Sequence, residues 1–394
     1  MASISTRCAF LFFKRCQIAR GRQTLNVARR KMSIKILDIG TPIVALSDAR
    51  RFISDCMVAV GTPREYGDIL AENLIEADYR GHYSHGMNRL DMYVRDVQGG
   101  LCDPKAAPCI IKETPATAWV NGNNGLGAVV GIYCMDLAIE KAKKSGIGMV
   151  VVKESNHYGI AGKYSLQAME QGLLGMSFTN TSPLMAPTRA KGSALGTNPL
   201  SLGAPAANGD SFVLDMATTA VAVGKIEIQK RKHEPIPEGW AQDESGNITM
   251  DAHVAYDAKR LMPLGGPELN SGYKGYGLGV LVEIFCGMLG GSAYGPNIRK
   301  WGDSSKKADL GQCFIAIDPG CFAPGFPERL SDFMGFLRNM EPADPAKPVL
   351  VPGDPERLHM ASVDEAGGVR YVQDQLDTCK SLAESLKVKP LIPT

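Results

Sequence analysis

The spacing of apolar residues predicts that helices and strands alternate along the chain from about Pro42 onward. The first strong helix signal is the segment 62–65, Thr-Pro-Arg-Glu, which has the residue order of a capping box. Gly81 should interrupt the helix that follows, whose buried face would hold Ile69, Leu70, Leu74 and Ala77. A second helix is expected to begin at Ser84 and to end at the glycine pair 99–100. Its apolar stripe would consist of Met87, Leu90, Val94 and Val97.

Further along, short apolar runs predict strands at 117–120, 148–152, 173–180, 200–203, 212–217 and 313–318. Helical periodicity predicts a helix ending near Lys144 and others at 162–171, 221–232, 272–291, 328–340 and 364–387. The helix at 272–291 is so apolar that we expect burial on most of its sides. Residues 233–272 are polar and rich in Pro and Gly, which indicates a long excursion. Strands that alternate with helices predict an α/β fold.

The first 37 residues differ from the rest of the chain. They contain nine Lys or Arg and neither Asp nor Glu. Arg, Ser and Thr recur in this segment, as is typical of an amphipathic mitochondrial transit peptide. We therefore expect a basic presequence at 1–37 and a mitochondrial location. A disordered basic tail, or translation starting at Met32 in a cytoplasmic protein, is the alternative.

Composition excludes several classes of partner. The chain has 394 residues, 43 basic and 41 acidic side chains and a net charge of +2, so it lacks the basic character of nucleic-acid-binding proteins. No apolar run approaches the roughly 18 residues that a membrane helix requires. No CxxC pair or HExxH motif occurs. His82 and His85 lie close in sequence without an evident third ligand, and we expect no metal site.

One glycine-rich segment imitates a dinucleotide-binding fingerprint. The strand at 117–120 is followed by Gly125, Gly127 and Gly131, then by a helix, a strand and Glu154. However, the third glycine is displaced by one position, and residues 121–124 lengthen the turn. We therefore interpret these glycines as a turn before an ordinary helix.

The segment 82–93, HYSHGMNRLDMY, contains the first candidate site. In a helix that begins at Ser84, the side chains of His85, Arg89 and Tyr93 share one face. Arg89 offers a planar fork of donors for a carboxylate, and His85 can exchange a proton near it. A small substrate with a carboxylate beside a hydroxyl would use both groups. The alternative is a solvated helix face.

His157 is the second candidate. The sequence Asn156-His157-Tyr158-Gly159 directly follows the apolar strand at 148–152, and α/β proteins usually build their sites at the carboxyl ends of strands. The alternative is a structural histidine in a loop. A serine hydrolase is not indicated, because no GxSxG motif occurs, and no Walker loop is present.

Six blocks in the order found here support a family resemblance: HYSHGMNRL, SNHYGIAGKYS, GTNPLSLGAP, LDMATTAVAVGKIEI, GYKGYGLGVLVEIFCGMLGG and VPGDPERL. Together they span about residues 40–360. The chain resembles the type-2 malate/L-lactate dehydrogenases, a family that includes ureidoglycolate and sulfolactate dehydrogenases and some imine-acid reductases.

The resemblance implies a non-Rossmann NAD(P)-binding fold, a mixed sheet with surrounding helices, over residues 38–394. Residues 38–150 and 310–394 would form the substrate and dimerisation part, and residues 151–310 the cofactor-binding part. It also implies a homodimer with its active site near the subunit interface.

The resemblance further implies roles for single residues. His157, His85 and Ser84 would be catalytic, and Arg89 and Tyr93 would bind substrate. The cofactor would contact residues 157, 181, 215–217, 274 and 353, that is His157, Thr181, Asp215, Met216, Ala217, Lys274 and Gly353. Some imine reductases of the family place an acid at the position of Lys225, so a lysine there favours a hydroxy acid.

The expected activity is reversible malate oxidation with NAD or NADP, NAD being favoured. We favour His157 as the proton acceptor, with Ser84 and His85 orienting the substrate, although the sequence leaves the choice between His157 and His85 open. Two other functions remain: reduction of another 2-oxo acid or cyclic imino acid, and an inactive binding or scaffold protein on the same fold.

Overall fold

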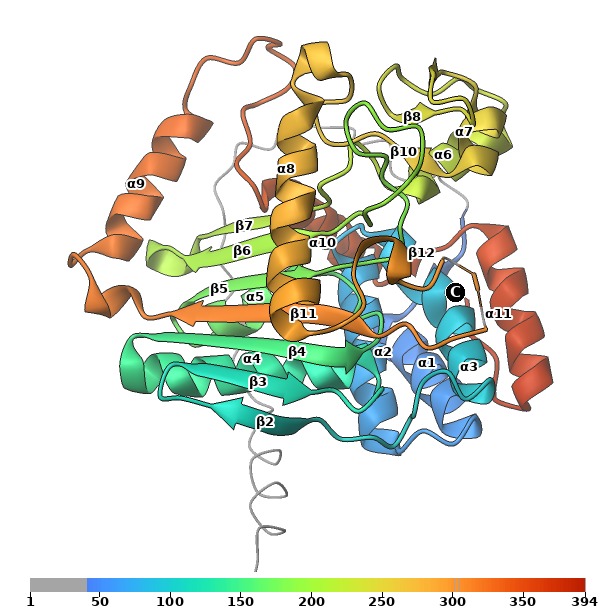
Figure 1. The fold of residues 1–394 in the computed structure, drawn as a ribbon, viewed down its shortest axis with the longest axis horizontal. Helices are drawn as coiled ribbons and strands as arrows, with labels where there is room; N and C mark the ends of the chain where they lie inside the picture. The colour runs from blue at the N-terminus through green and yellow to red at the C-terminus, as the bar shows by residue number, and fades with distance from the viewer. Residues whose placement is uncertain (1–40, 301, 304, 394) are drawn as a thin grey trace, which may run out of the picture. The chain divides into compact units, whose positions relative to one another are not determined.

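A computed structural model describes residues 41–300, 302–303 and 305–393 (Figure 1). The predicted presequence at 1–37 lies outside the described residues. Nothing tests the predicted division into substrate and cofactor parts, which stays a prediction.

A seven-stranded mixed sheet organises the described chain, with the strand order β2-β3-β4-β11-β5-β6-β7. Its strands are β2 (Cys109–Glu113), β3 (Thr117–Asn121), β4 (Ile147–Ser155), β5 (Leu174–Thr179), β6 (Leu200–Pro205), β7 (Ser211–Met216) and β11 (Leu310–Ile317). Within this sheet only β3 and β4 pair in parallel, with α4 (Gly127–Ser145) connecting them. The predicted α/β class and mixed sheet are confirmed, and the sheet is not the parallel one of the doubly wound nucleotide-binding folds.

Helices cover both faces of the sheet because successive strand residues point to opposite sides. In β4, Val150 and Val152 pack towards α4 and α5 (Gly162–Met169), whereas Val151 packs towards α8 (Gly272–Glu283) and the π-helical turn Ile284–Met288. Figure 1 shows α8 in front of the sheet and α4 and α5 behind it.

The prediction that the helix at 272–291 is buried on most sides is wrong. Val282 and Cys286 are fully buried against the sheet, but the opposite side carries large exposed apolar residues. They are Tyr273, Leu281, Ile284, Met288 and Leu289. The helix lies on the outer surface of a sheet, so only one of its sides meets the core.

A separate layer of helices packs beside the sheet around a second apolar core. It contains α1 (Leu46–Ala59), α2 (Arg64–Tyr79), α3 (Leu90–Gln98), α10 (Asp354–Ala366) and α11 (Gln373–Leu386). The predicted stripe of Met87, Leu90, Val94 and Val97 is buried in this core. Two short strands, β1 (Ile43–Val44) and β12 (Val369–Arg370), pair and fasten the carboxyl-terminal segment to it.

Three predicted helix boundaries are wrong for local reasons. Thr62 does not cap α2, because its N–H bonds to the Met57 carbonyl at the end of α1, which leaves Pro63 at the N-cap. The helix expected from Ser84 starts only at Leu90, after two 3₁₀ turns, η1 (Tyr83–His85) and η2 (Met87–Arg89). The helix expected at 364–387 is broken at Gly367, where φ is +78°.

After β7, the helix predicted at 221–232 is α6 (Val223–Lys232), and it is followed by the predicted excursion at 233–272, which carries short elements of its own. They are β8 (Ala241–Gln242), β9 (Ile248–Thr249), α7 (Ala252–Ala258) and β10 (Arg260–Leu261). Helix α9 (Phe326–Arg338) follows β11. Among the described helices, none combines the length and hydrophobicity that a membrane crossing requires.

Candidate active site

The structure brings the two candidate histidine segments together. The rings of His85 and His157 stack with centroids 5.9 Å apart and planes inclined by 19°. The Tyr93 hydroxyl lies 2.6 Å from His157 Nδ1. Residues that are 64 positions apart in the sequence therefore form one cluster.

The turn at 84–89 orients His85 and Arg89, although not as one helical face. Ser84 Oγ lies 2.9 Å from His85 Nδ1, and Arg89 Nε donates to the Ser84 carbonyl at 2.6 Å. Gly86 separates the two 3₁₀ turns with an extended backbone (φ −94°, ψ −141°). His85 and Arg89 thus lie close together as predicted, but two 3₁₀ turns separated by Gly86 bring them together instead of one helix.

The loop that carries His157 is rigidly held on both sides. The Asn156 side chain donates to the Gly125 carbonyl at 2.9 Å, and the Tyr158 hydroxyl bonds Ser177 Oγ at 2.9 Å. A Cβ at Gly127 would collide with the carbonyls of Asn156 and His157. The glycine-rich segment therefore lets α4 approach the histidine loop, which explains its glycines without a phosphate site.

Burial sets the charge state of the cluster. It is the main cause that lowers the pKa of His85 to about 4, with Arg89 and His82 adding to the effect. Burial, with His85 and Arg89, also lowers the pKa of His157 well below its usual value. Both imidazoles are therefore neutral at neutral pH, the state in which histidine accepts a proton.

Arg89 supplies positive charge beside these neutral rings. Burial lowers the pKa of Arg89, and Glu227 on α6 opposes that effect. The start of α6 lies against the cluster, since a Cβ on Gly224 would come within 3.5 Å of Ser84 Cβ. Lys225, one residue further along α6, is exposed.

The candidate cofactor residues follow one edge of the sheet. Pairing aligns Phe178 of β5 with Leu200 of β6, and Leu200 with Met216 of β7, so these positions lie in one row across the sheet. Thr181 follows β5, Asp215 and Met216 end β7 at this edge, and Ala217 comes directly after it. On the other side of β11, the end of β4 reaches the same edge, because Ser155 pairs with Leu310 and Thr179 with Gln312. His157 follows β4, so these candidate residues share one edge of the sheet.

The sequence of this chain matches the family model of the malate/L-lactate dehydrogenases over residues 44–379. The chain belongs to this family. It is 40% identical over 343 residues to a malate dehydrogenase of Pyrococcus abyssi, which covers 86% of this chain and 94% of that protein. It is 38% identical over 316 residues to an L-sulfolactate dehydrogenase of Methanocaldococcus jannaschii, covering 80% and 89% of the two chains.

The fold agrees with that assignment. The structure of malate dehydrogenase from Pyrococcus horikoshii matches with a TM-score of 0.83 and 35% identity, covering 90% of this chain and 99% of that one. The family is one of 2-hydroxy acid dehydrogenases, so this dehydrogenase is an oxidoreductase, and its class implies a nicotinamide cofactor.

The residues of the dehydrogenase at the sheet edge fit such a cofactor. Asp215 accepts the Gly162 N–H at 2.8 Å, and burial raises the pKa of its carboxyl. A carboxylate accepts hydrogen bonds only, so it suits the hydroxyl groups of a bound cofactor. Thr181 follows β5 and Thr197 precedes β6, and Thr181 Oγ1 accepts the Thr197 N–H at 2.9 Å.

Two further candidates, Lys274 and Gly353, come from α8 and α10. Lys274 is exposed in the first turn of α8. The next residue, Gly275, packs against Leu264, whose N–H bonds the Thr218 carbonyl at 2.9 Å. Gly353 caps α10 with φ +99° and packs against Val213 in the middle of β7. Only glycine adopts that conformation readily, so the backbone alone can explain why position 353 is a glycine.

Sequence reasoning missed several residues that support the cluster. Asp78 and Asn73 on α2 are buried beneath it, and Glu227 lies near Arg89. Asn73 Nδ2 donates to the Tyr158 carbonyl at 3.0 Å. Asn73 and Asp78 lie at buried positions of α2. Nothing in the sequence indicated this, because polar residues are usually exposed.

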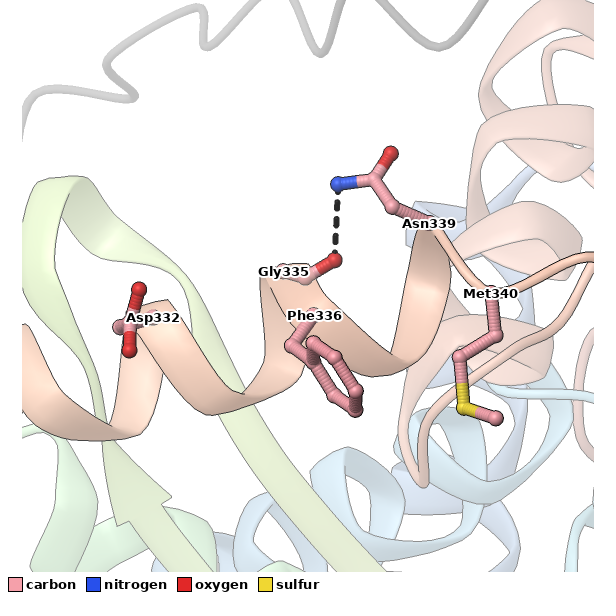
Figure 2. Close-up of a pocket in the computed structure, with 5 residues that line it drawn as sticks. All are labelled: Asp332, Gly335, Phe336, Asn339 and Met340. Atoms are coloured by element: carbon pink, nitrogen blue, oxygen red, sulfur yellow. Dashed lines mark hydrogen bonds between the residues drawn. The ribbon is translucent and has the colours of Figure 1, made fainter.

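A pocket of about 470 Å³ lies apart from these residues, on α9 and the turn after it (Figure 2). It is lined by Asp332, Gly335, Phe336, Asn339 and Met340. None of the candidate site residues lines it. Within the described residues, no group of three or more His, Cys, Asp or Glu is arranged to hold a metal ion.

Proposed function

We propose that the protein oxidises malate reversibly with NAD or NADP, NAD being favoured, and that His157 takes up the hydroxyl proton. The observation that carries the proposal is the contact of 2.6 Å between the Tyr93 hydroxyl and His157 Nδ1, with the half-buried Arg89 in the same cluster. The 40% identity to a malate dehydrogenase supports malate as the substrate.

Each residue of the cluster has a distinct task in this proposal. The guanidinium of Arg89 receives the substrate carboxylate next to the reacting carbon. Tyr93 engages His157 Nδ1, so the proton is exchanged at Nε2 on the opposite side of the ring. Ser84 and His85 orient the hydroxyl or carbonyl oxygen of the substrate.

The bound nicotinamide supplies the hydride acceptor. Asp215 and the neighbouring residues at the ends of the strands would hold this cofactor. Proton uptake by His157 then accompanies oxidation, and the same nitrogen returns the proton in the reduction of the oxo acid.

A second candidate substrate is another small 2-hydroxy acid. The relative of Methanocaldococcus jannaschii named L-sulfolactate dehydrogenase favours it. The exposed Lys225 argues against an acid relay of the imine-reductase kind at that position.

Absorbance at 340 nm tests the proposal directly. The purified protein is supplied with NAD or NADP and with malate, lactate, sulfolactate and ureidoglycolate in turn. We expect the highest kcat/KM with malate. A higher kcat/KM with another acid would identify that acid as the substrate in place of malate. Inactivity with every acid of the panel would support a binding or scaffold function.

We also propose a homodimer, supported by the exposed apolar side of α8 and the turn after it. Ile284, Met288 and Leu289 are each about half exposed, at 48%, 52% and 57%. Contiguous apolar surface of this kind usually marks an interface. Light scattering after size-exclusion chromatography should give twice the chain mass, and a monomer that retains full activity would refute the proposal.

The basic character of residues 1–37 supports a mitochondrial location as part of the same proposal. Import of the full chain into isolated mitochondria, compared with a chain starting at Met32, tests it. If neither chain enters the mitochondria, a cytoplasmic location would be favoured.

A further inference from the structure

A buried carboxylate lies directly beneath the turn that carries His85 and Arg89. Asp78, in the last turn of α2, is fully buried. Its Oδ2 accepts the backbone N–H of Met87 at 2.9 Å and the hydroxyl of Tyr371 at 2.7 Å. One oxygen atom therefore joins α2, the second 3₁₀ turn and the carboxyl-terminal segment.

The turn itself is shaped around this side chain. A Cβ at Gly86 would collide with the Asp78 carboxylate. Gly86 is the residue at which the chain leaves η1 and enters η2, with His85 before it and Met87 after it. The carboxylate thus occupies the space that an ordinary side chain at position 86 would fill.

Tyr371 holds the carboxylate from the other side. Its ring is 3% exposed and packs edge-on against Tyr83 in η1, with centroids 6.3 Å apart. Its backbone follows β12, which pairs with β1. The position of the Tyr371 hydroxyl is therefore set by the docked carboxyl-terminal segment.

We propose that Asp78, held by Tyr371, is a positioning residue that sets the 84–89 turn so that His85 and Arg89 face His157. This rests on the proposed function, because it assigns Asp78 a part in binding and orienting the acid. The hydrogen bonds of Asp78 go to Tyr371 and to the backbone of Met87, so it acts on His85 and Arg89 through that backbone.

The contact does not depend on the charge of the carboxyl. Burial raises the pKa of Asp78 to about 7, while Tyr371 and the Met87 N–H oppose that shift. A protonated carboxyl and an amide both keep one oxygen that accepts two hydrogen bonds. An asparagine at position 78 should therefore preserve the turn, whereas an alanine cannot.

The experiment compares four variants of the full chain. Asp78→Ala removes both bonds, Asp78→Asn keeps an acceptor, and Tyr371→Phe removes one bond. Tyr79→Phe is the matched control, because it removes a hydroxyl bond to Asp364 at 2.9 Å from the neighbouring residue of α2, on the exposed side. The measurements are KM for the acid, kcat and the Kd of NADH by fluorescence.

We expect KM for the acid to rise on the order of tenfold or more in Asp78→Ala and about fivefold in Tyr371→Phe, since one net hydrogen bond corresponds to about that factor. Asp78→Asn should recover most of the loss, and Tyr79→Phe should match the wild type. The Kd of NADH should stay within about twofold throughout, because the cofactor residues lie on the sheet edge. A purely structural role would lower stability and leave the KM values unchanged.

Amide hydrogen exchange at Met87 provides a reading that does not need turnover. Exchange should accelerate in Asp78→Ala and remain slow in Asp78→Asn. If the wild type oxidises no acid, the proposed function fails while this measurement still tests the turn. If Asp78→Ala does not fold, Tyr371→Phe and Asp78→Asn decide. Unchanged KM in a folded Asp78→Ala or in Tyr371→Phe, or unchanged Met87 exchange in Asp78→Ala, would overturn the proposal.

Discussion

Replacing Tyr93 with phenylalanine should slow the reaction while leaving the substrate anchor intact. The change removes the hydroxyl that lies 2.6 Å from His157 Nδ1 and keeps the aromatic ring, which packs edge-on against the imidazole at 5.7 Å. Arg89 is unchanged, so KM for the acid should move by less than kcat.

The size of the effect follows from the charge that His157 gains. A hydrogen bond between neutral groups contributes about 1 kcal/mol, and one to a charged group roughly 1.5–3 kcal/mol. Only the difference, about 0.5–2 kcal/mol with a midpoint near 1.25 kcal/mol, favours the state in which the imidazole holds the proton. The loss in kcat should therefore be about tenfold.

A tautomer change would enlarge this loss. The N–H of Gly159 reaches His157 Nδ1 at 3.4 Å and can only donate. Without the Tyr93 oxygen as acceptor, it favours the tautomer that carries its proton on Nε2, which cannot accept a proton from the substrate. With this tautomer change, the loss in kcat should exceed tenfold.

Initial rates at 340 nm over a range of acid concentrations measure this prediction, with Tyr79→Phe as the control for loss of a tyrosine hydroxyl. The Tm of each variant verifies folding. A folded Tyr93→Phe enzyme with wild-type kcat, or one whose whole defect lies in KM, would refute the role given to Tyr93.

Three other predictions concern charge, pH and packing. Arg89→Lys should raise KM for the acid by on the order of tenfold and change kcat less, because a point charge replaces the planar fork; an unchanged KM would count against the anchor. His85, whose pKa is lowered to about 4, binds a proton more weakly in the folded state than in the unfolded state. The contribution of His85 to folding stability should therefore be fully present above about pH 6.5, and about 3 kcal/mol of it should be lost as the pH drops towards 4. Urea unfolding of His85→Asn should lack this part of the pH dependence. Gly127→Ala should lower the free energy of unfolding by more than about 1 kcal/mol and reduce kcat, since its Cβ meets the carbonyls at 156 and 157; a stabilised variant would contradict the packing explanation.

Local periodicity predicted much of the fold because it depends on neighbours in the sequence. The buried stripe from Met87 to Val97 and the strand at 148–152 were recognised in this way, and the position of His157 followed from the end of that strand. The exposed side of α8 was missed, because composition reveals how apolar a helix is and not which side a sheet covers.

The sequence predicted that the side chains of the candidate site lie close together, but not which contacts bring them together. His85, Arg89 and Tyr93 do converge on one cluster, but the expected helix from Ser84 is broken at Gly86. At this break the Asp78 carboxylate packs against Gly86 and accepts the Met87 N–H. It also accepts the hydroxyl of Tyr371, which lies 293 residues away in the sequence. Contacts of that range leave no trace in local spacing, so the carboxylate beneath the turn could not be foreseen.

Substitution of His157 tests the central claim most directly, namely that this imidazole takes the proton of a hydroxy acid held by Arg89. The kcat of His157→Ala for oxidation of the preferred acid should fall by about 10²–10⁴-fold. Its Kd for NADH should rise only modestly, because the other cofactor contacts remain. A folded His157→Ala protein that turns over at the wild-type rate would contradict the account.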